Sequence, residues 1–279
     1  MTIFRTNINK QTEFYLKKQS INFQNNIFLA DLHEKNLNIE LKLLIYYISE
    51  GGIRFRVEPK NAENFTRYDI TNNTIIINEQ NLNQKQIIFH SQKSTYSILS
   101  GFESTKIEIH YNPLKVIVKS MNQQIVVINN NNFLNFNLHT GKDQTPDIYD
   151  NFIETRKNGI TVVSCDFEFP DDVEITGFGS RSKTMNLQNV QFRMANFGGF
   201  SNYGTVPYFI AHSEKLMASI FWMNPTETIV NISQNHEAKI VKLMSESGFI
   251  DFVISTGTFP QIMKSYTNII GTPMMPPLY

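Results

Sequence analysis

The sequence is poor in cysteine, tryptophan and net charge. One Cys and one Trp occur among 279 residues, and 25 Lys and Arg residues balance 25 Asp and Glu residues. Cys165 has no second cysteine with which to form an intrachain disulfide or to hold zinc or an iron–sulfur cluster. The balanced charge leaves no basic excess to neutralise phosphates, so we expect neither nucleic acid nor a membrane surface as a partner.

Long apolar runs are also missing. The densest one, residues 41–48, is interrupted by Lys42 and falls well short of the run of about 18 apolar residues that crosses a bilayer. Residues 1–14 are polar and lack the apolar centre of a secretory signal. We therefore expect no membrane span, and a cytoplasmic location if Met1 is the natural start.

The sequence does contain many short runs in which apolar and polar residues alternate. In residues 106–111, Ile107, Ile109 and Tyr111 share one face of a strand, and Asn112 with a following proline ends the run. Similar patterns predict strands at residues 36–48, 52–57, 74–78, 86–90, 106–111, 114–119, 125–128, 133–136, 160–169, 208–212, 218–223, 228–232, 238–245 and 248–256. So many short strands predict an all-β protein with two packed sheets.

One helix is predicted, near the end of the sequence. Thr258 is a candidate N-cap for residues 259–269, Pro260 suits the first turn, and Gly271 ends the pattern. We expect a domain organisation with an N-terminal extension (1–25), a β-sandwich (26–257), and a helix with a linker (258–279).

Loops are expected where polar and turn-forming residues gather. Residues 137–154 are polar and contain Gly141 and Pro146, which is typical of a long loop. The sequence is rich in Asn, including a run of four at 129–132, which we interpret as loop composition because Asn readily occupies turns.

Two acidic residues form one candidate catalytic pair. Asp166 and Glu168 are two apart in a predicted strand, so their side chains share a face about 6.6 Å apart along the backbone. This spacing approaches the separation of the acid and nucleophile in glycoside hydrolysis. Alternation alone also predicts these residues on the solvent face of a strand whose other face holds Phe167, and we favour that interpretation.

His212 is a second candidate, as a general acid or base with Glu214 or Glu227 in a sugar-epimerising sandwich. A strand-end histidine bonded to the backbone is the simpler interpretation. The six His residues lie in no metal-binding motif, so no metal or other cofactor is expected. Trp222 could stack on a sugar ring, but its apolar surroundings favour a place in the core.

Several segments together resemble the N-terminal region of glycoside hydrolase family 31, and within it most closely the glucosidase II α subunits. Residues 107–118 are similar to a strand pair of the family, residues 204–212 to its "YGSVPYMIAH", residues 221–228 to its "FWLNAAETW" and residues 244–251 to its "MSESGIID". Residues 266–278 resemble the passage that leads into the family's catalytic barrel. The order and spacing of the segments match as well.

The resemblance implies a galactose-mutarotase-like β-sandwich (a supersandwich) of the kind that precedes a (β/α)8 barrel. In the family both catalytic aspartates belong to that barrel, and the sandwich contributes at most a loop to the sugar site. No catalytic residue is therefore assigned in this chain. The resemblance also implies relatives in the lumen of the endoplasmic reticulum.

The sequence departs from the family at positions that could bind sugar. Gly198 stands where the family has the aspartate of the substrate loop, and Ser180 and Arg181 replace a Glu and a His. The cysteine near the family's mature N-terminus corresponds to Asn7. The substrate-loop candidates that follow from this alignment are Arg193, Asn196, Phe197, Gly198 and Tyr208.

Our leading expectation is a non-catalytic, carbohydrate-associated domain of an α-glucosidase-like protein, from a truncated or split relative. Its expected partner is a carbohydrate or a separately encoded catalytic barrel. A free-standing mutarotase-like module that binds or epimerises a sugar is one alternative. A partner-binding sandwich that docks another chain through residues 259–279 is another.

Overall fold

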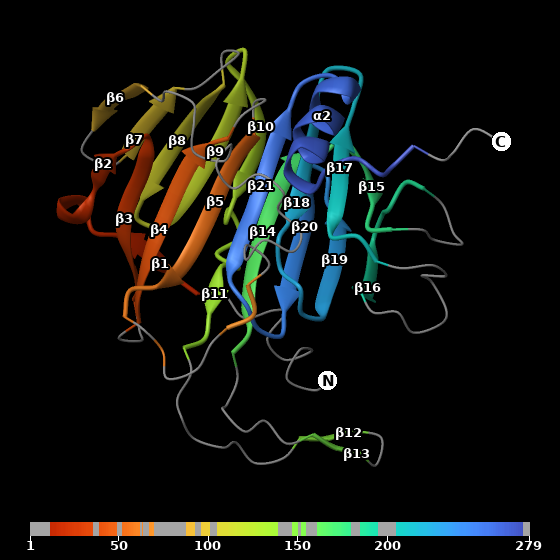
Figure 1. The fold of residues 1–279 in the computed structure, drawn as a ribbon, viewed down its shortest axis with the longest axis horizontal. Helices are drawn as coiled ribbons and strands as arrows, with labels where there is room; N and C mark the ends of the chain where they lie inside the picture. Colours follow the sequence, from red (N-terminus) through yellow and green to blue (C-terminus); the bar gives the residue numbers. More distant parts are fainter. Residues whose placement is uncertain are drawn as a thin grey trace.

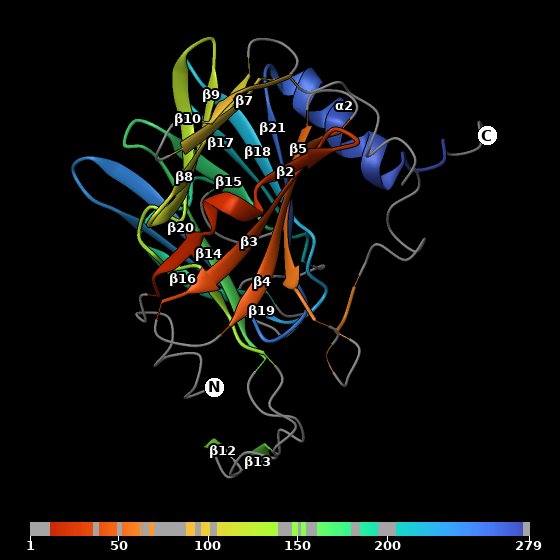
Figure 2. The ribbon, with the colours of Figure 1, turned by 90° about the vertical axis from the view of Figure 1, so that its left-hand side faces the viewer.

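The computed structural model describes residues 12–35, 39–48, 52–61, 63, 67–69, 88–92, 96–100, 105–138, 147–149, 152–154, 161–179, 185–194 and 205–275. Two large antiparallel sheets pack face to face, and one α-helix lies outside them (Figure 1). Figure 2, turned by 90°, shows the two layers from the side. The predicted all-β, two-sheet sandwich with one C-terminal helix is therefore confirmed.

The first sheet has nine strands in the order β1-β3-β4-β5-β21-β18-β17-β15, and β2 pairs with β3. Its strands are β1 (Phe14–Leu16), β2 (Asn22–Gln24), β3 (Ile27–Glu34), β4 (Glu40–Tyr47), β5 (Gly52–Pro59), β15 (Glu174–Gly177), β17 (Tyr208–His212), β18 (Met217–Trp222) and β21 (Ile250–Thr256). Strands distant in sequence therefore lie side by side, as β5 and β21 do.

The second sheet has ten strands in the order β16-β19-β20-β14-β10-β9-β8-β7-β6, and β11 pairs with β14. Its strands are β6 (Ile88–Gln92), β7 (Tyr96–Ser100), β8 (Lys106–Tyr111), β9 (Leu114–Ser120), β10 (Gln123–Ile128), β11 (Asn135–Phe136), β14 (Val163–Pro170), β16 (Val190–Met194), β19 (Thr228–Gln234) and β20 (Ala238–Ser245). A 3-10 turn, η1 (Lys18–Ser20), precedes β2, and β12 (Asp147–Tyr149) pairs only with β13 (Phe152–Glu154).

Aromatic side chains join the two sheets in the core. The Phe167 ring of β14 meets the Phe252 ring of β21 edge to face, with centroids 4.9 Å apart, and Trp222 stacks on Phe252 at 5.9 Å. Trp222 is fully buried, and its Nε1 donates a hydrogen bond to Ser245 Oγ at 2.9 Å. Burial of such rings is the main source of stability here, and the core interpretation of Trp222 is confirmed.

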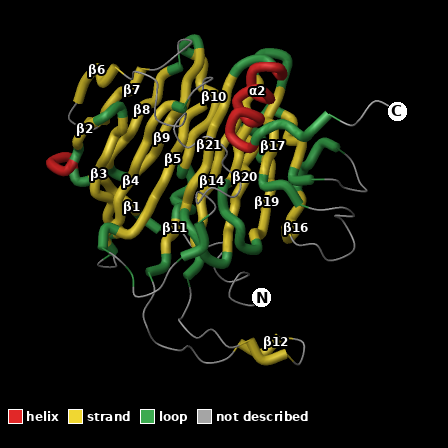
Figure 3. The backbone as a smooth tube through the Cα atoms, viewed as in Figure 1, coloured by secondary structure: helices red, strands yellow, loops and turns green. Residues whose placement is uncertain are grey.

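Helix α2 (Phe259–Ile270) packs against the outer side of the first sheet, over β18 and β21 (Figure 3). The Tyr266 ring lies 4.2 Å from the Tyr208 ring and 5.1 Å from the Phe221 ring, measured between centroids. The Ser255 and Ser265 hydroxyls share a buried hydrogen bond of 2.7 Å. The predicted helix and the place of Thr258 before it are confirmed.

Most of the predicted strand ranges agree with observed strands, and several observed strands were missed. Thirteen of the fourteen predicted ranges overlap strands of the two sheets, although 133–136 contains only the two-residue β11, and 74–78 lies outside the described residues. Among the strands of the two sheets, β1, β2, β3, β7, β15 and β16 were not predicted. The long loop predicted at 137–154 is wrong for its last part, because β12 and β13 form a hairpin there.

The predicted domain boundaries stay predictions. Within residues 1–25, the described strands β1 and β2 both pair with β3, and so belong to the first sheet. None of the helices that the structure describes is long and apolar enough to cross a membrane.

Candidate functional site

Four consecutive asparagines follow β10, and two of them, Asn130 and Asn131, bind the acidic pair of β14. Asn131 donates from its backbone N and from its side-chain Nδ2 to Asp166 Oδ2, at 3.0 Å each. The same Nδ2 also donates to Glu168 Oε2 at 3.1 Å. Asn130 Nδ2 donates to Glu168 Oε1 at 2.6 Å. The structure thus brings Asp166 and Glu168 to one face, as predicted, but holds both through amides of the preceding loop.

The remaining asparagines of the run shape its backbone. Asn129 and Asn132 have φ angles of 60° and 52°, the left-handed region that asparagine tolerates better than most residues. Asn129 Nδ2 donates to the Leu114 carbonyl at 2.8 Å, and Asn129 Oδ1 accepts from Leu134 N at 2.8 Å. The run lies in the turn after β10, as predicted from its composition, and its side chains also hold that turn in place through hydrogen bonds.

Asp166 itself is buried, so the expected solvent face is wrong for this residue. Its side chain has no exposed surface, and Oδ1 also accepts from Phe133 N at 3.1 Å. Burial raises the pKa of Asp166, and the hydrogen bonds from Asn131 and Phe133 partly oppose that shift. A carboxylate enclosed by donors in this way stabilises a loop and has no open side for a glycosidic oxygen.

Two other predicted site residues meet at the edge of the second sheet. The Arg193 guanidinium, on edge strand β16, forms a salt bridge and hydrogen bond with the Glu227 carboxylate, which lies in the loop before β19. The main chain places them together, because Met194 pairs with Thr228 and Arg193 with Ile229. Arg193 was predicted in the substrate loop and Glu227 as a partner of His212, so their contact was not expected.

The other candidates are separate from this ion pair. Tyr208 begins β17 and is covered by α2, with its hydroxyl 3.9 Å from Met263 Sδ, and burial raises its pKa. His212 ends β17 opposite Glu174 of β15, so it lies at the far end of a five-residue strand from Tyr208. Of the substrate-loop candidates, Asn196, Phe197 and Gly198 lie outside the described residues.

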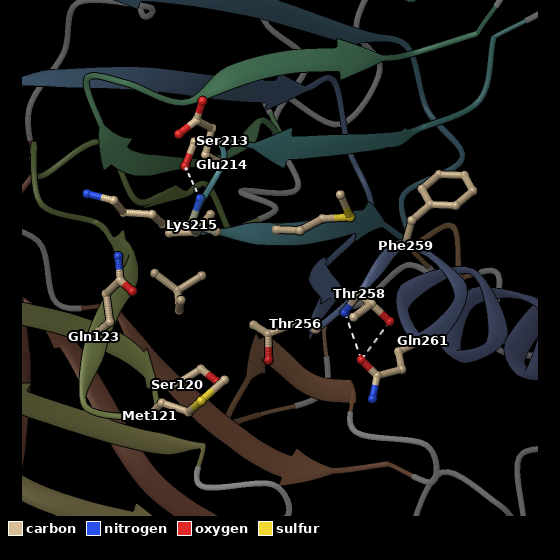
Figure 4. A pocket seen from close by; sticks show the side chains of 14 residues that line it. Ser120, Met121, Gln123, Ser213, Glu214, Lys215, Thr256, Thr258, Phe259 and Gln261 are labelled. Carbon is tan, nitrogen blue, oxygen red and sulfur yellow. Dashed lines mark hydrogen bonds between the residues drawn. The ribbon is translucent and has the colours of Figure 1, made fainter.

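Glu214 lines a pocket at one end of the sandwich. Three segments enclose it: the β9–β10 turn, the β17–β18 turn and the start of α2 (Figure 4). Its volume is about 510 Å³. The lining side chains belong to Ser120, Met121, Gln123, Ile125, Ser213, Glu214, Lys215, Leu216, Met217, Thr256, Thr258, Phe259 and Gln261, with Gly257 between two of them. The sequence offered no local signal for this pocket, because its walls come from three distant turns.

A buried ion network on the outer side of the first sheet was also missed. Arg54 binds both oxygens of Asp251, with Nε 2.8 Å from Oδ1 and Nη2 2.6 Å from Oδ2. Arg56 binds Asp251 Oδ2 at 2.6 Å and Asp69 at 2.8 Å. The available signal was a strand, β5, in which charged residues alternate with fully buried apolar ones such as Phe55. No cluster of three His, Cys, Asp or Glu able to hold a metal occurs in the described part of the chain.

The two-sheet sandwich with a covering helix is the architecture of a mutarotase-like domain. Residues 42–231 match the family described as "Glycosyl hydrolase 31 N-terminal galactose mutarotase-like domain". The chain belongs to this family, as the resemblance in the sequence indicated.

Relatives with assigned names are α-glucosidases. The chain is 24% identical over 260 residues to neutral alpha-glucosidase C of Mus musculus, which covers 73% of this chain and 29% of the relative. It is 26% identical over 267 residues to glucosidase 2 subunit alpha of Saccharomyces cerevisiae, which covers 81% and 28% respectively. The chain therefore spans less than a third of the length of these relatives.

Solved structures share the fold. A heterodimeric glucosidase II complex from the endoplasmic reticulum, made of the catalytic subunit and the binding domain of a regulatory subunit, superposes with a TM-score of 0.86 at 17% identity and covers 99% of this chain and 37% of that one. A family 31 dextranase of Flavobacterium johnsoniae superposes with a TM-score of 0.66 at 14% identity and covers 96% and 29%. At these identities the likeness shows the fold alone.

Proposed function

We propose that this chain is the carbohydrate-associated sandwich of an α-glucosidase-like protein and does not hydrolyse glycosides by itself. Glycoside hydrolysis would then require a catalytic barrel that these 279 residues do not include. The observation that carries the proposal is the state of the acidic candidates: Asn131 bridges Asp166 and Glu168.

Glycoside hydrolysis needs two carboxyl groups on opposite sides of the scissile bond, held by a rigid scaffold. Asp166 and Glu168 instead project from one face of one strand and accept hydrogen bonds from the same amide. Glu227 is paired with Arg193. The pairing of His212 with Glu227 in a mutarotase-like mechanism gains no support either. Strand β17 separates His212 from the end of the sheet where Tyr208 and Phe221 pair, shortly before Glu227.

The test is an assay of the purified chain on an aryl α-glucoside. We expect no turnover above buffer. Turnover that is lost in Asp166→Asn or Glu168→Gln, in protein that retains its far-ultraviolet circular dichroism, would overturn the proposal. Turnover that survives both changes but is lost in His212→Gln would favour the mutarotase-like alternative site instead.

For the partner, we propose a catalytic barrel that docks next to the end of α2. Met274 and Met275, which follow α2 after residues 271–273, are 95% and 82% exposed. Such exposure is unusual for large apolar side chains in consecutive positions. Light scattering should show self-association of the isolated chain that decreases in Met274→Asp/Met275→Asp. Met185→Asp, at an equally exposed methionine elsewhere, is the control and should change nothing.

A further inference from the structure

The pocket at the end of the sandwich has apolar side chains on two separate walls. Among the described residues, the large hydrophobic side chains that stand exposed are Tyr68, Met121, Met185, Val206, Phe259, Met274 and Met275. Two of these line the pocket: Met121, 81% exposed, on the β9–β10 turn, and Phe259, 52% exposed, at the start of α2. Exposed apolar side chains that converge on one concavity from distant parts of a chain are typical of a ligand site.

The polar side chains of the pocket are mostly uncharged and available. Within the described part of the chain, the Gln123 and Thr256 side chains make no hydrogen bond to another described residue, and both line the pocket. Ser120 adds a further hydroxyl beside Met121 (Figure 4). An amide and two hydroxyls can donate and accept, which matches a ligand that carries hydroxyl groups.

The lining has no net formal charge that would attract a strongly charged ligand. Glu214 and Lys215 are the charged residues among those that line the pocket, and their formal charges cancel. The start of α2 adds little attraction for an anion, because Gln261 Oε1 already accepts a hydrogen bond from Thr258 N at 2.7 Å. A neutral ligand with hydroxyl groups and an apolar face fits this combination best.

We propose that this pocket binds a neutral sugar of one or two rings. The apolar C–H face of a ring packs against Phe259 and Met121, and its hydroxyls bond to Gln123, Thr256 and Ser120. The volume of about 510 Å³ lies within the range of about 300–1,000 Å³ that is usual for small-molecule sites.

This site is distinct from the substrate-loop candidates. The pocket contains the turn after His212, whereas Tyr208 lies at the other end of β17. The Arg193–Glu227 pair lies at the edge of the second sheet, and neither residue lines the pocket. Helix α2 begins at the pocket and runs along the sheet to Tyr266, which packs on Tyr208. Binding here requires no hydrolysis, so failure of the proposed function would leave this proposal standing.

The experiment is a titration of the 279-residue chain with maltose, followed by amide NMR and calorimetry. We expect a Kd of the order of 1 mM, as a shallow neutral site would give. Shifted amides should cluster at residues 120–125, 213–217 and 256–261. Met121→Ala and Phe259→Ala should each weaken binding several-fold, and the double variant should abolish it.

The controls distinguish specific sugar binding in the pocket from nonspecific binding and from binding of other ligands. Met185→Ala, at a methionine 83% exposed and outside the pocket, should bind maltose as the parent chain does. Circular dichroism must show that Phe259→Ala keeps α2. The proposal is overturned if maltose shifts no pocket amide, if the double variant binds unchanged, or if inorganic phosphate binds there in place of maltose.

Discussion

Asn131 and Asp166, 35 positions apart in sequence, link the asparagine run to the second sheet through two hydrogen bonds. Both the backbone N and the side-chain Nδ2 of Asn131 point to one oxygen of Asp166, and Phe133 N binds the other oxygen. All of these partners donate. A buried group at position 166 must therefore offer acceptors on both sides, which a carboxylate does and an amide does not.

The first prediction changes that chemistry and keeps the shape. Asp166→Asn replaces one acceptor oxygen by an NH2 group that faces another donor, and should lower the free energy of unfolding by about 1–3 kcal/mol. Urea denaturation with an unchanged m-value is the measurement. Asp171→Asn, in the exposed turn after β14, is the control. Equal midpoints for the two variants would contradict a stabilising role for Asp166.

Asp166 also shows why the sequence predicted the sheets better than the site. Strands β8, β9, β14 and β20 were predicted because alternation is a local property that burial of one face enforces. The burial of Asp166 depends on a loop that folds back over β14, and no periodicity within either segment encodes that contact. Strand β16 was missed because it is a short edge strand with exposed Gln191 and Arg193.

Strand β3 (Ile27–Glu34) was missed although its buried face is regular. The sequence predicted β4 from its apolar residues but not β3, its partner, although β3 has a strict inward set of Phe28, Ala30 and Leu32. Its outward residues Asp31 and His33 interrupt the apolar pattern. They lie opposite Lys42 and Glu40 across the strand pair, so the reason for their presence is visible only in the pairing register.

The second prediction concerns the ion network of β5 and β21. Asp251 is 1% exposed and binds both Arg54 and Arg56. Desolvation alone would lower the pKa values of these guanidiniums, but they are raised because Asp251, and for Arg56 also Asp69, outweighs it. Asp251→Asn should leave the buried Arg54 without a counter-charge and leave Arg56 with Asp69 and Glu58 alone. It should lower the free energy of unfolding by about 3–5 kcal/mol.

Chemical denaturation of Asp251→Asn and Glu13→Gln compares a buried with an exposed ion pair. Glu13 binds Lys35, and both side chains are more than half exposed, so Glu13→Gln should leave the midpoint unchanged. A small effect of Asp251→Asn, similar to that of Glu13→Gln, would show that Arg54 and Arg56 reach water.

His33, on β3 of the first sheet, is a buried titratable group. His33 is 6% exposed, its ring stacks on Tyr15 with centroids 5.7 Å apart, and its Nδ1 lies 3.7 Å from Glu40 Oε1. Burial is the main cause that lowers the pKa of His33. Four charged groups lie around it: Lys17 and Lys60 lower the pKa further, and Glu40 and Asp31 oppose the shift.

The third prediction follows from the sign of that shift. Because the folded pKa lies below the ordinary value of about 6.5, the unfolded chain takes up the proton first as the pH falls. The stability from neutral His33 is therefore complete above about pH 6.5 and is lost as the pH falls through that value towards the folded pKa. When the pH falls from 7 to 5, the denaturation midpoint should drop more for the parent chain than for His33→Gln. His236→Gln, at an exposed histidine, should keep the parent's pH dependence, and identical slopes for all three chains would refute the assignment.

The last prediction compares two glycines with nearly the same unusual backbone angle. Gly177 ends β15 at φ 126°, and Gly257 precedes α2 at φ 133°. A Cβ at Gly177 would lie 2.6 Å from the Tyr208 carbonyl and 2.7 Å from Phe209 Cα, which are main-chain atoms of the neighbouring strand. A Cβ at Gly257 would lie 2.7 Å from the Gln261 amide oxygen, which can rotate away. Both alanine variants share the conformational strain that a residue other than glycine has at such angles.

Gly177→Ala should therefore lower the free energy of unfolding by about 1–3 kcal/mol more than Gly257→Ala, since only the former forces β15 and β17 apart. Thermal and urea denaturation of the two variants measure the difference, and a greater loss in Gly257→Ala would mean that the Gln261 contact at the start of α2 matters more than the pairing of β15 with β17.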